Sequence, residues 1–375
     1  MRIAFVSIAT PHARSSWSGI PWYALRALQG AGHDVTVVTT PRLDALAERF
    51  RRAEWLGFPI KRHPWLVNVY ARRIDAQLAA IRPDAVVAIS AAHKIARSRP
   101  DFPVVYATDA MFASMADYYR HYSARSGLQL RYGNSAQHDL IERVDRFAMA
   151  SKWGMDDAVR RYGMPADRAV IVPMGANLDV DPGFQPVDRS APLTLLFVGY
   201  NWARKRGELV LAAWRILRER TGNAELHIVG ADPASARGLA GVTVHGRLNK
   251  MDEGDYRRLS ALYARSHFFF MPSEREAYGI VYCEAAAFGR PAIATATGGV
   301  STIVDHGRTG LLLDELAGPE AYAEQILALW NRPDDHLAMC HAARARYETV
   351  LNWQAWAGRI TTLAEEAIAE RAARP

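Results

Sequence analysis

Residues 272–285 read Pro272-Ser273-Glu274-Arg275-Glu276-Ala277-Tyr278-Gly279-Ile280-Val281-Tyr282-Cys283-Glu284-Ala285. Two carboxylates, Glu276 and Glu284, stand in this stretch with seven residues between them. An apolar run, 267–271, precedes it, and 279–288 is predicted to form a helix that ends at a Gly-Arg-Pro sequence. A strand, a loop and a helix start in that order favour a phosphate site, because the first backbone N–H groups of a helix have no partner within it. Two acids at a helix start are also common as surface residues that the helix dipole favours.

Length and composition indicate a globular protein of two domains. The chain has 375 residues, of which 50% are hydrophobic and 23% are charged. This length exceeds that of one ordinary core, and the composition differs from that of disordered chains. The two cysteines, Cys283 and Cys340, stand far apart and form neither a disulfide framework nor a zinc spacing.

The N-terminus and the charge bear on location and partners. Residues 1–6 enter a strand-like run directly, without an apolar signal segment, and no stretch has the apolar length that spans a bilayer. We therefore expect a cytoplasmic protein. The formal net charge of +7 favours anionic partners without choosing among nucleotides, acidic lipids and nucleic acid.

Short apolar runs alternate with helical stretches along the whole chain, which predicts an α/β fold with parallel sheets. The predicted strands are 2–6, 34–39, 85–89, 104–107, 147–150 and 169–172 in the first half, and 194–198, 225–229, 242–245, 267–271, 292–295 and 310–313 in the second. Residues 179–192 contain three prolines and no apolar periodicity, which is typical of a linker. We predict domains at 1–178 and 193–350, this linker, and a C-terminal helix over 351–375.

The opening stretch resembles a known family. Its pattern, Pro-Ser-x-x-Glu-x-aromatic-Gly-x4-Glu-Ala, is similar to the Glu-x7-Glu signature of the retaining glycosyltransferases of family 4. The resemblance implies the GT-B fold, in which two Rossmann-like doubly wound domains face a central cleft and the last helix crosses back onto the first domain. The first domain would be the acceptor side and the second would bind the nucleotide sugar.

The same resemblance assigns roles around the helix start. Glu284 would accept hydrogen bonds from the two ribose hydroxyls of a sugar nucleotide, and Glu276 would contact hydroxyls of the donor sugar. The backbone that faces the sugar and the diphosphate would come from Ala277, Tyr278, Gly279 and Ile280.

A second matching segment, 197–207, would contact the donor diphosphate. Lys205 stands at the family's lysine, and Gly199 ends the strand before it. Tyr200 stands where the family has an arginine, and Arg204 is the substitute that we expect, since a guanidinium binds phosphate oxygens in a bidentate way. The basic run could also be no more than a solvated loop.

Two further segments resemble the family less specifically. Arg247 and Leu248 follow a predicted strand and would lie beside the nucleobase. A glycine pair, 298–299, follows the next family strand, but Thr302 stands where many members carry a glutamate.

In the first half, Gly19 follows the first strand, where family members have a glycine loop near the donor phosphate and the acceptor. Asp109 stands near the place of a histidine that many members carry beside the donor sugar. Asp109 would contact a sugar hydroxyl or assist the acceptor; alternatively, it caps the following helix.

Basic and aromatic residues mix between 49 and 73, and the mixture suits contact with an anionic membrane. That surface would serve an enzyme with a lipid-linked acceptor at the inner face of the membrane. The alternative is a pair of solvated helices whose aromatics face the core. No recognised nucleic-acid module accompanies the charge, so a nucleic-acid partner is not expected.

The resulting prediction is a hexosyltransferase-type enzyme that moves a sugar from a nucleoside diphosphate to a glycan, lipid-linked or small-molecule acceptor. The resemblance implies that it needs no metal, which agrees with the absence of an Asp-x-Asp pair in a suitable context, and no cofactor besides the nucleotide sugar is expected. Two alternatives remain: a non-transferring GT-B protein such as an epimerase or a phosphorylase, and a nucleotide-sugar-binding scaffold. A dehydrogenase is disfavoured, because no Gly-x-Gly-x-x-Gly follows the first strand.

Overall fold

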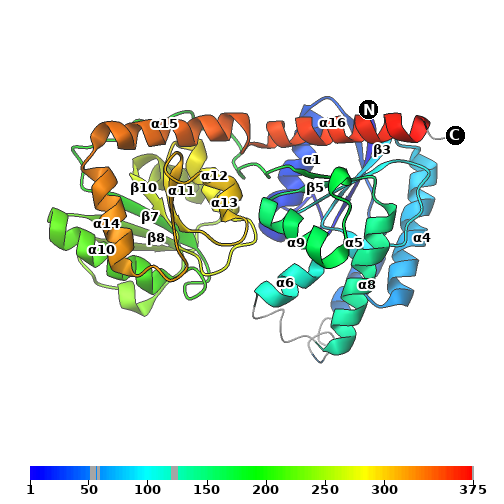
Figure 1. The fold of residues 1–375 in the computed structure, drawn as a ribbon, viewed down its shortest axis with the longest axis horizontal. Coiled ribbons are helices and arrows are strands. Elements are labelled where there is room, and N and C mark those ends of the chain that lie inside the picture. The colour runs from blue at the N-terminus through cyan, green and yellow to red at the C-terminus, as the bar shows by residue number, and fades with distance from the viewer. Residues whose placement is uncertain (51–55, 57–59, 120–125, 374–375) are drawn as a thin grey trace. The chain divides into compact units, whose positions relative to one another are not determined.

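The computed structural model describes residues 1–50, 56, 60–119 and 126–373, which divide into two compact units (Figure 1). The first unit consists of Met1–Pro173 and Trp353–Pro375, and the second of Met174–Asn352. The chain therefore passes between the units twice. The predicted linker, 179–192, lies within the second unit, a few residues after the first crossing.

The first unit is built on a parallel six-stranded sheet of order β2-β1-β3-β4-β5-β6. Its strands are β1 (Arg2–Ser7), β2 (Asp34–Val37), β3 (Ala85–Ile89), β4 (Val104–Thr108), β5 (Arg146–Met149) and β6 (Ala169–Ile171). Every residue of β3, β4 and β5 is buried. A strand that is covered on both faces reads as a continuous apolar run, which is why the sequence predicts these strands well.

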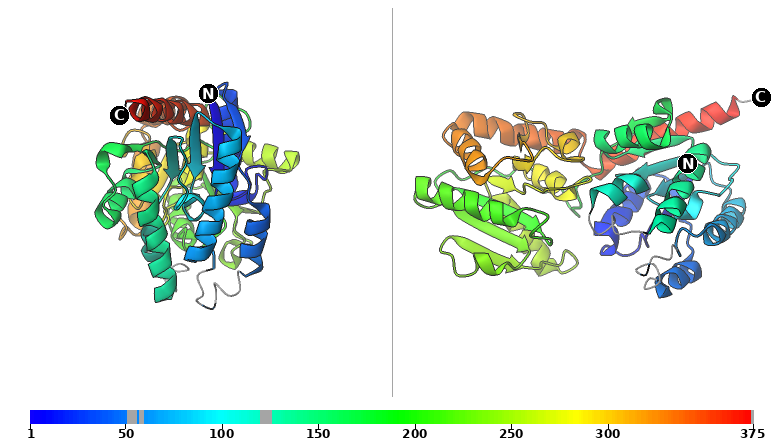
Figure 2. Two further views of the ribbon diagram at one scale, coloured as in Figure 1. Left: turned by 90° about the vertical axis from the view of Figure 1, so that its right-hand side faces the viewer. Right: turned by 60° about the horizontal axis from the view of Figure 1, so that its bottom comes forward.

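Helices cover this sheet on both sides, as the left view of Figure 2 shows. They are α1 (Ile20–Gly30), α2 (Pro41–Arg49), α4 (Pro64–Ile81), α5 (Ala92–Ile95), α6 (Phe112–Tyr118), α8 (Gly127–Arg143), α9 (Lys152–Tyr162) and α16 (Trp353–Ala372), with 3₁₀ turns η1 (Ser16–Gly19) and η2 (Ala166–Arg168).

The C-terminal helix α16 belongs to the first unit and lies beside α1 (Figure 1). Trp353, Trp356 and Ile360 are buried, as their helical spacing predicts for an amphipathic helix. Near the end of the helix, Arg371 forms a bidentate ion pair with Asp145, with both N–O distances 2.9 Å. Apolar burial and this ion pair together hold the last helix on the sheet of the first unit.

The second unit repeats the architecture with the order β12-β11-β10-β7-β8-β9, again all parallel. Its strands are β7 (Thr194–Gly199), β8 (Glu225–Gly230), β9 (Val242–Gly246), β10 (Phe268–Phe270), β11 (Ala292–Thr295) and β12 (Gly310–Leu313). Its helices are α10 (Gly207–Thr221), α11 (Glu253–Arg265), α12 (Ile280–Ala287), α13 (Val300–Ile303), α14 (Pro319–Trp330) and α15 (Pro333–Thr349), with the turn η3 (Ala234–Ala236). The predicted α/β fold of two doubly wound units is confirmed.

The strand order places a topological switch point in each sheet. In the second unit, β7 pairs directly with β10, and the chain leaves these two strands in opposite directions across the sheet. Ligands of doubly wound sheets bind outside the carboxyl ends of the strands at such a point. The loops that follow β7 and β10 therefore define where a site is expected in this unit.

Candidate functional site

The loops after β7 and β10 meet at the carboxyl edge of the second sheet. The first loop, 200–206, carries Arg204 and Lys205, and the second, 271–279, carries Glu276. A backbone hydrogen bond of 2.9 Å from the Glu274 N–H to the Arg204 carbonyl joins them. Loops 200–206 and 271–279, which the sequence connects only through the family resemblance, are thus in direct contact.

Glu276 is the centre of this structure. Its Oε2 atom accepts hydrogen bonds from Lys205 Nζ and, at 3.3 Å each, from Arg204 Nη1 and Ser273 Oγ. Glu276 and Lys205 are both 8% exposed, so the ion pair between them is nearly buried. Arg204 also donates to the Arg275 carbonyl at 2.5 Å, which keeps its guanidinium over the loop.

Burial and charge act against each other in this pair. Burial raises the pKa of Glu276, but the Lys205 and Arg204 charges outweigh it and bring the pKa below its ordinary value. Burial lowers the pKa of Lys205, and Glu276 opposes that change. The carboxylate is therefore held ionised against two cations. Such a group can orient hydroxyl donors, while the cations beside it can face a phosphate.

The backbone after β7 is shaped to present the two cations. The Asn201 side chain accepts from the Arg204 N–H at 3.0 Å, and the Asn201 carbonyl accepts from the Lys205 N–H at 3.0 Å. Arg206 takes a left-handed conformation with φ of 53° at the N-cap of α10. A non-glycine residue in this conformation is uncommon and is often found where function fixes the backbone.

The helix α12 begins at a glycine that its conformation requires. Gly279 is the N-cap and has φ of 96°, a region that side chains rarely adopt. A Cβ atom there would lie 2.6 Å from the Tyr282 ring and 3.0 Å from Glu276 Cγ. The glycine thus allows the helix start to approach the carboxylate of Glu276 closely.

One turn further, α12 places Glu284 with no exposed surface. Its Oε1 atom accepts from Lys250 Nζ at 2.5 Å and its Oε2 atom from the Tyr263 hydroxyl at 3.3 Å. Burial, with the Glu284 carboxylate next to it, raises the pKa of Tyr263 well above its ordinary value. The hydroxyl therefore stays protonated and acts as a donor to Glu284.

Sequence reasoning misses Lys250 and Tyr263. Lys250 stands in the loop after β9, at the same edge of the sheet as the loops after β7 and β10. Lys250 follows a predicted strand, and the carboxyl ends of parallel strands all lie at one edge of the sheet. This position is the signal from which Lys250 could have been predicted as a site residue. Tyr263 stands in the buried face of α11 and offers no signal beyond an apolar period.

The other residues predicted beside the helix start divide into buried and accessible ones. Ala277 and Tyr278 are buried, and the Tyr278 hydroxyl donates to the Met174 carbonyl at 2.6 Å. The Tyr278 side chain therefore fixes the loop from within the unit. Gly279 and Ile280 are partly exposed, so the backbone that starts α12 is accessible at these two residues.

Tyr200 and Arg247 form a pair at the same edge. Tyr200 is 66% exposed, and the Arg247 guanidinium lies over its ring, 5.4 Å from the centroid. The ring lies close above Gly230, where a Cβ atom would be 3.3 Å from Tyr200 Cδ1. Leu248, which follows Arg247, is buried. An exposed ring with a cation on it offers a flat surface for stacking.

The glycine pair after β11 also touches the site. The Gly299 N–H donates to the Glu276 carbonyl at 3.0 Å, and Gly298 has φ of 52°. Thr302 lies in α13, where its carbonyl accepts from Arg346 Nη2. The glycine pair thus supports the Glu276 loop, and Thr302 supports the packing of α15 on α13.

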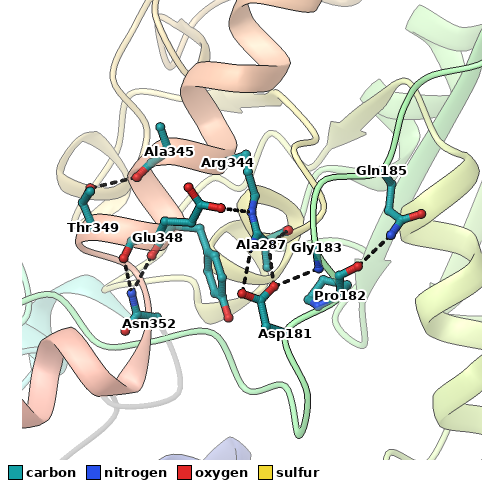
Figure 3. Close-up of polar contacts among 11 residues, drawn as sticks. Asp181, Pro182, Gly183, Gln185, Ala287, Arg344, Ala345, Glu348, Thr349 and Asn352 are labelled. Carbon is teal, nitrogen blue, oxygen red and sulfur yellow. Dashed lines mark hydrogen bonds and ion pairs between the residues drawn. The ribbon is translucent and has the colours of Figure 1, made fainter.

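A strap of the chain, residues 181–185, crosses the C-terminal end of α12 (Figure 3). Arg344 on α15 donates to both carboxylate oxygens of Asp181, at 2.6 and 2.8 Å, and to the Ala287 carbonyl at 2.6 Å. Arg290 donates to the Gln185 carbonyl, and the Phe184 ring stacks on His341 with centroids 4.2 Å apart. The strap fixes the far end of the helix that carries Glu284.

In the first unit, Gly19 also follows a strand at a switch point, between β1 and β3. It has φ of 86° and is the N-cap of α1. The two residues before it, Trp17 and Ser18, are left-handed as well, with φ of 45° and 56°. The left-handed conformation is costly for Trp17 and Ser18 but not for glycine, and such residues occur where a loop has to take one special shape.

Asp109 comes directly after β4 and is partly exposed. Asp109 is not the N-cap residue of the following helix. The N-cap of α6 is Met111, and the Ala113 N–H in the first turn donates to the Tyr162 hydroxyl at 2.8 Å. The carbonyl of Asp109 instead packs against Gly154, where a Cβ atom would lie 2.4 Å away. Asp109 and Gly19 both stand at the carboxyl edge of the first sheet.

The basic and aromatic stretch 49–73 is described only in part. Arg51, Arg52, Trp55 and Phe58 lie outside the described residues. Of the described aromatics, Tyr70 is 1% exposed and Trp65 is 61% exposed. The stretch therefore sends one aromatic into the core and leaves another on the surface of α4.

Two family models match the chain. One, described as glycosyl transferases group 1, matches residues 192–332, and the other, described as glycosyltransferase family 4, matches residues 22–180. Between them they cover strands β2 to β6 of the first sheet and all six strands of the second. The resemblance carried by the Glu-x7-Glu string is confirmed and extends to the first half of the chain.

Curated relatives carry the name D-inositol 3-phosphate glycosyltransferase. The protein from Corynebacterium glutamicum is 27% identical over 62% of this chain, and that from Pseudarthrobacter chlorophenolicus is 28% identical over 56%. The matches span 60% and 53% of these relatives' own lengths, which is less than two thirds.

Solved structures share the fold over the full length. Sucrose-phosphate synthase from Thermosynechococcus elongatus superposes with a TM-score of 0.69 at 20% identity and covers 98% of this chain and 99% of its own. Anabaena HepE in complex with UDP superposes with a TM-score of 0.64 at 13% identity and covers 98% and 100%. Both likenesses show the same two-unit architecture.

Proposed function

The chain belongs to the glycosyltransferases of group 1 and family 4, with the GT-B fold, and from this premise we propose that it transfers a sugar from a nucleoside diphosphate sugar to an acceptor with retention at the anomeric carbon. The observation that carries the proposal is the buried Glu276 carboxylate held between Lys205 and Arg204 at the switch point of the second sheet. The Glu276 carboxylate suits the hydroxyls of a sugar, and the Lys205 and Arg204 cations suit a diphosphate.

The central electrostatic task of such a transfer is to stabilise the negative charge that grows on the leaving diphosphate. Lys205 and Arg204 supply two positive charges there, and the N-terminal end of α12 adds the partial charge of its free N–H groups. These groups are fixed by the contacts of their own loops before a ligand arrives. We propose that they stabilise the leaving group without a metal ion and without a further cofactor.

In the reaction that we propose, the bond between the anomeric carbon and the diphosphate oxygen breaks, and the acceptor oxygen bonds to the same face of the sugar. The acceptor proton passes to the departing phosphate oxygen. Glu276 then orients the donor sugar through its hydroxyls, so that the position of charge matters more than any single base. In the first unit, we assign Gly19 to the loop that approaches the donor phosphate, and Asp109 to a contact with a sugar hydroxyl or with the acceptor.

The names of similar proteins support a proposal for the classes of donor and acceptor. HepE is in complex with UDP, and the curated relatives are named D-inositol 3-phosphate glycosyltransferase. We propose a nucleotide sugar as donor and a hydroxyl-bearing glycan, lipid-linked sugar or small molecule as acceptor. No described helix is long and apolar enough to cross a membrane. For a lipid-linked acceptor, we propose peripheral contact of the basic α4 region with anionic lipid from the cytoplasmic side.

A screen of UDP-, GDP- and ADP-sugars tests this function. One of these donors is expected to raise the unfolding temperature and to release its nucleoside diphosphate in the presence of the protein. Glu284→Ala is expected to weaken donor binding by about 10- to 100-fold, since a charged hydrogen bond to the ribose is lost. A protein that neither binds nor consumes any nucleotide sugar would contradict the proposal, and epimerisation of the donor without transfer would replace it.

A further inference from the structure

Glu284 is a buried carboxylate that already accepts hydrogen bonds from two donors, about half of the number that its two oxygens can accept. It has no exposed surface, and an ionised carboxylate in such a place needs compensating partners. Lys250 donates to one oxygen and Tyr263 to the other. A carboxylate offers about four acceptor positions on its two oxygens, so one donor on each oxygen leaves about two positions.

Lys250 is the member of this group that reaches toward solvent. Its side chain is 31% exposed, while that of Glu284 is 0% exposed and Tyr263 is 0% exposed. Its ammonium also lies 3.5 Å from the Asn177 carbonyl, so it bridges α12 and the chain segment that opens the second unit. Lys250 is therefore the most accessible of the three side chains.

The loop that carries Lys250 is built to hold it there. The Asn249 N–H donates to Asp255 at 2.9 Å, and the Asn249 side chain accepts from the Met251 N–H at 3.1 Å. Asp252 caps α11 by accepting from the Asp255 N–H at 2.9 Å. Asn249 is thus tied to the first turn of α11 and Met251 to Asn249, so the backbone on both sides of Lys250 is constrained.

From this geometry we propose that Lys250 is a positioning residue of the donor site. It holds Glu284 so that the two remaining acceptor positions receive the 2′- and 3′-hydroxyls of a ribose, and it thereby selects ribonucleotides over 2′-deoxyribonucleotides. The inference rests on the proposed function, because it assumes that a nucleotide binds at this edge. It assigns to Lys250 and Tyr263 a role in that binding.

The test is a calorimetric titration of the whole protein with UDP, ADP and GDP and with their 2′-deoxy forms. The unmodified protein is expected to bind one ribonucleotide about 10- to 100-fold more tightly than its deoxy form, since one buried acceptor position loses its donor. Lys250→Met is expected to weaken binding of the ribonucleotide by about tenfold or more and to reduce this preference. Lys250→Arg, which keeps the charge and a donor, is expected to restore most of both.

Lys152→Met is the matched control. Lys152 pairs with Asp156 in the first unit, and their side chains are 67% and 54% exposed, so the same substitution there is expected to change neither number. If Lys250→Met does not fold, Lys250→Gln, which removes the charge and keeps a donor, is judged by the same two numbers.

Three results would overturn the inference. Lys250→Met could bind as the unmodified protein does, or bind more weakly with an unchanged preference, which would reduce Lys250 to a structural role. It could also bind more tightly, which would make Lys250 a competitor of the ribose. A lack of binding of any of the six nucleotides by the unmodified protein would instead contradict the proposed function, so the two failures are distinguishable.

Discussion

At the scale of single residues, the site depends on which charges are brought together. The sequence assigns separate roles to Glu276 and Lys205, but the structure joins them in one buried ion pair. The roles follow from a motif, whereas the contact follows from the pairing of β7 with β10. Lys250 and Tyr263 illustrate the same limit, because only the folded sheet shows that their side chains meet Glu284.

The Lys205–Glu276 pair leads to a prediction that separates stability from activity. Lys205→Met is expected to lower the free energy of unfolding by about 3 kcal/mol, because it leaves a buried carboxylate with a weaker set of partners. The double variant Lys205→Met/Glu276→Gln is expected to regain most of that stability, since no buried charge is left without its counter-ion. Urea unfolding of the variants measures both effects.

Turnover is expected to respond differently. Both variants lack the cation that we place at the leaving group, so the turnover of the donor found in the screen is expected to stay low in each. A double variant that regains stability and turnover together would show that Lys205 acts on the fold alone.

At the scale of elements, the sequence predicts the strands well and their mutual contacts poorly. All twelve predicted strands are present, with ends that differ by no more than two residues. Parallel strands are buried on both faces and read as short apolar runs, which a sequence displays directly. The strap on α12 depends instead on Arg344, which is 163 residues away from Asp181 in the chain, and no local pattern shows that contact. The left-handed residues before α1 have no signal in the sequence either.

The start of α12 provides a prediction at this scale. Gly279→Ala is expected to destabilise the protein by about 1–3 kcal/mol, because alanine would be strained at φ of 96° and its Cβ would lie 2.6 Å from the Tyr282 ring. Donor binding is expected to weaken as well, since relief of the strain moves the helix start away from Glu276. Thermal unfolding and nucleotide titration measure the two effects.

Gly358→Ala in α16 is the control for this change. Nothing lies within 4 Å of the Cβ position at Gly358, and alanine in a helix is expected to stabilise the protein by about 0.5–1 kcal/mol. Equal effects of the two substitutions would contradict the argument from conformation.

His227 on β8, which lies beside His245 on β9, leads us to expect that the stability of the protein depends on pH. Burial, followed by the charges of Arg265 and His245, lowers the pKa of His227 to about 3 from 6.5. Glu225, whose Oε2 atom lies 3.6 Å from the ring, does not offset these effects. Between these two values the unfolded chain binds a proton that the folded chain does not, so stability falls as the pH falls below 6.5.

From pH 7.5 to 5, His227 is expected to account for a loss of about 2 kcal/mol, at about 1.4 kcal/mol for each pH unit below 6.5. His227→Gln, which stays neutral and can accept from Arg265, is expected to lose correspondingly less stability over this range. Urea unfolding at the two pH values decides the matter. An equal loss in both proteins would show that His227 is not the titrating group.

At the scale of the whole molecule, the last helix belongs to the first unit although it follows the second in the chain. Ile360→Ala is expected to lower the stability of the first unit by about 2–5 kcal/mol, because Ile360 on α16 has no exposed surface. The nucleotide affinity of the folded protein is expected to stay unchanged, since Glu276, Glu284 and Lys205 lie in the second unit.

Differential scanning calorimetry with and without the bound nucleoside diphosphate tests this independence. The nucleotide is expected to stabilise the second unit, and Ile360→Ala to destabilise the first. Arg359→Ala, at an exposed position of the same helix, is the control and is expected to change neither. A loss of nucleotide affinity in the folded Ile360→Ala protein would contradict the assignment of the donor site to the second unit.

The central claim is that the second unit binds a nucleoside diphosphate sugar through Glu284 and that Lys205 stabilises the leaving diphosphate. Release of nucleoside diphosphate from UDP-, GDP- and ADP-sugars, followed with the unmodified protein, Glu284→Ala and Lys205→Met/Glu276→Gln, tests it most directly. We predict release from one donor by the unmodified protein, a raised KM for Glu284→Ala and a lowered kcat for the double variant. Equal release by all three proteins, or release by none of them, would contradict the claim.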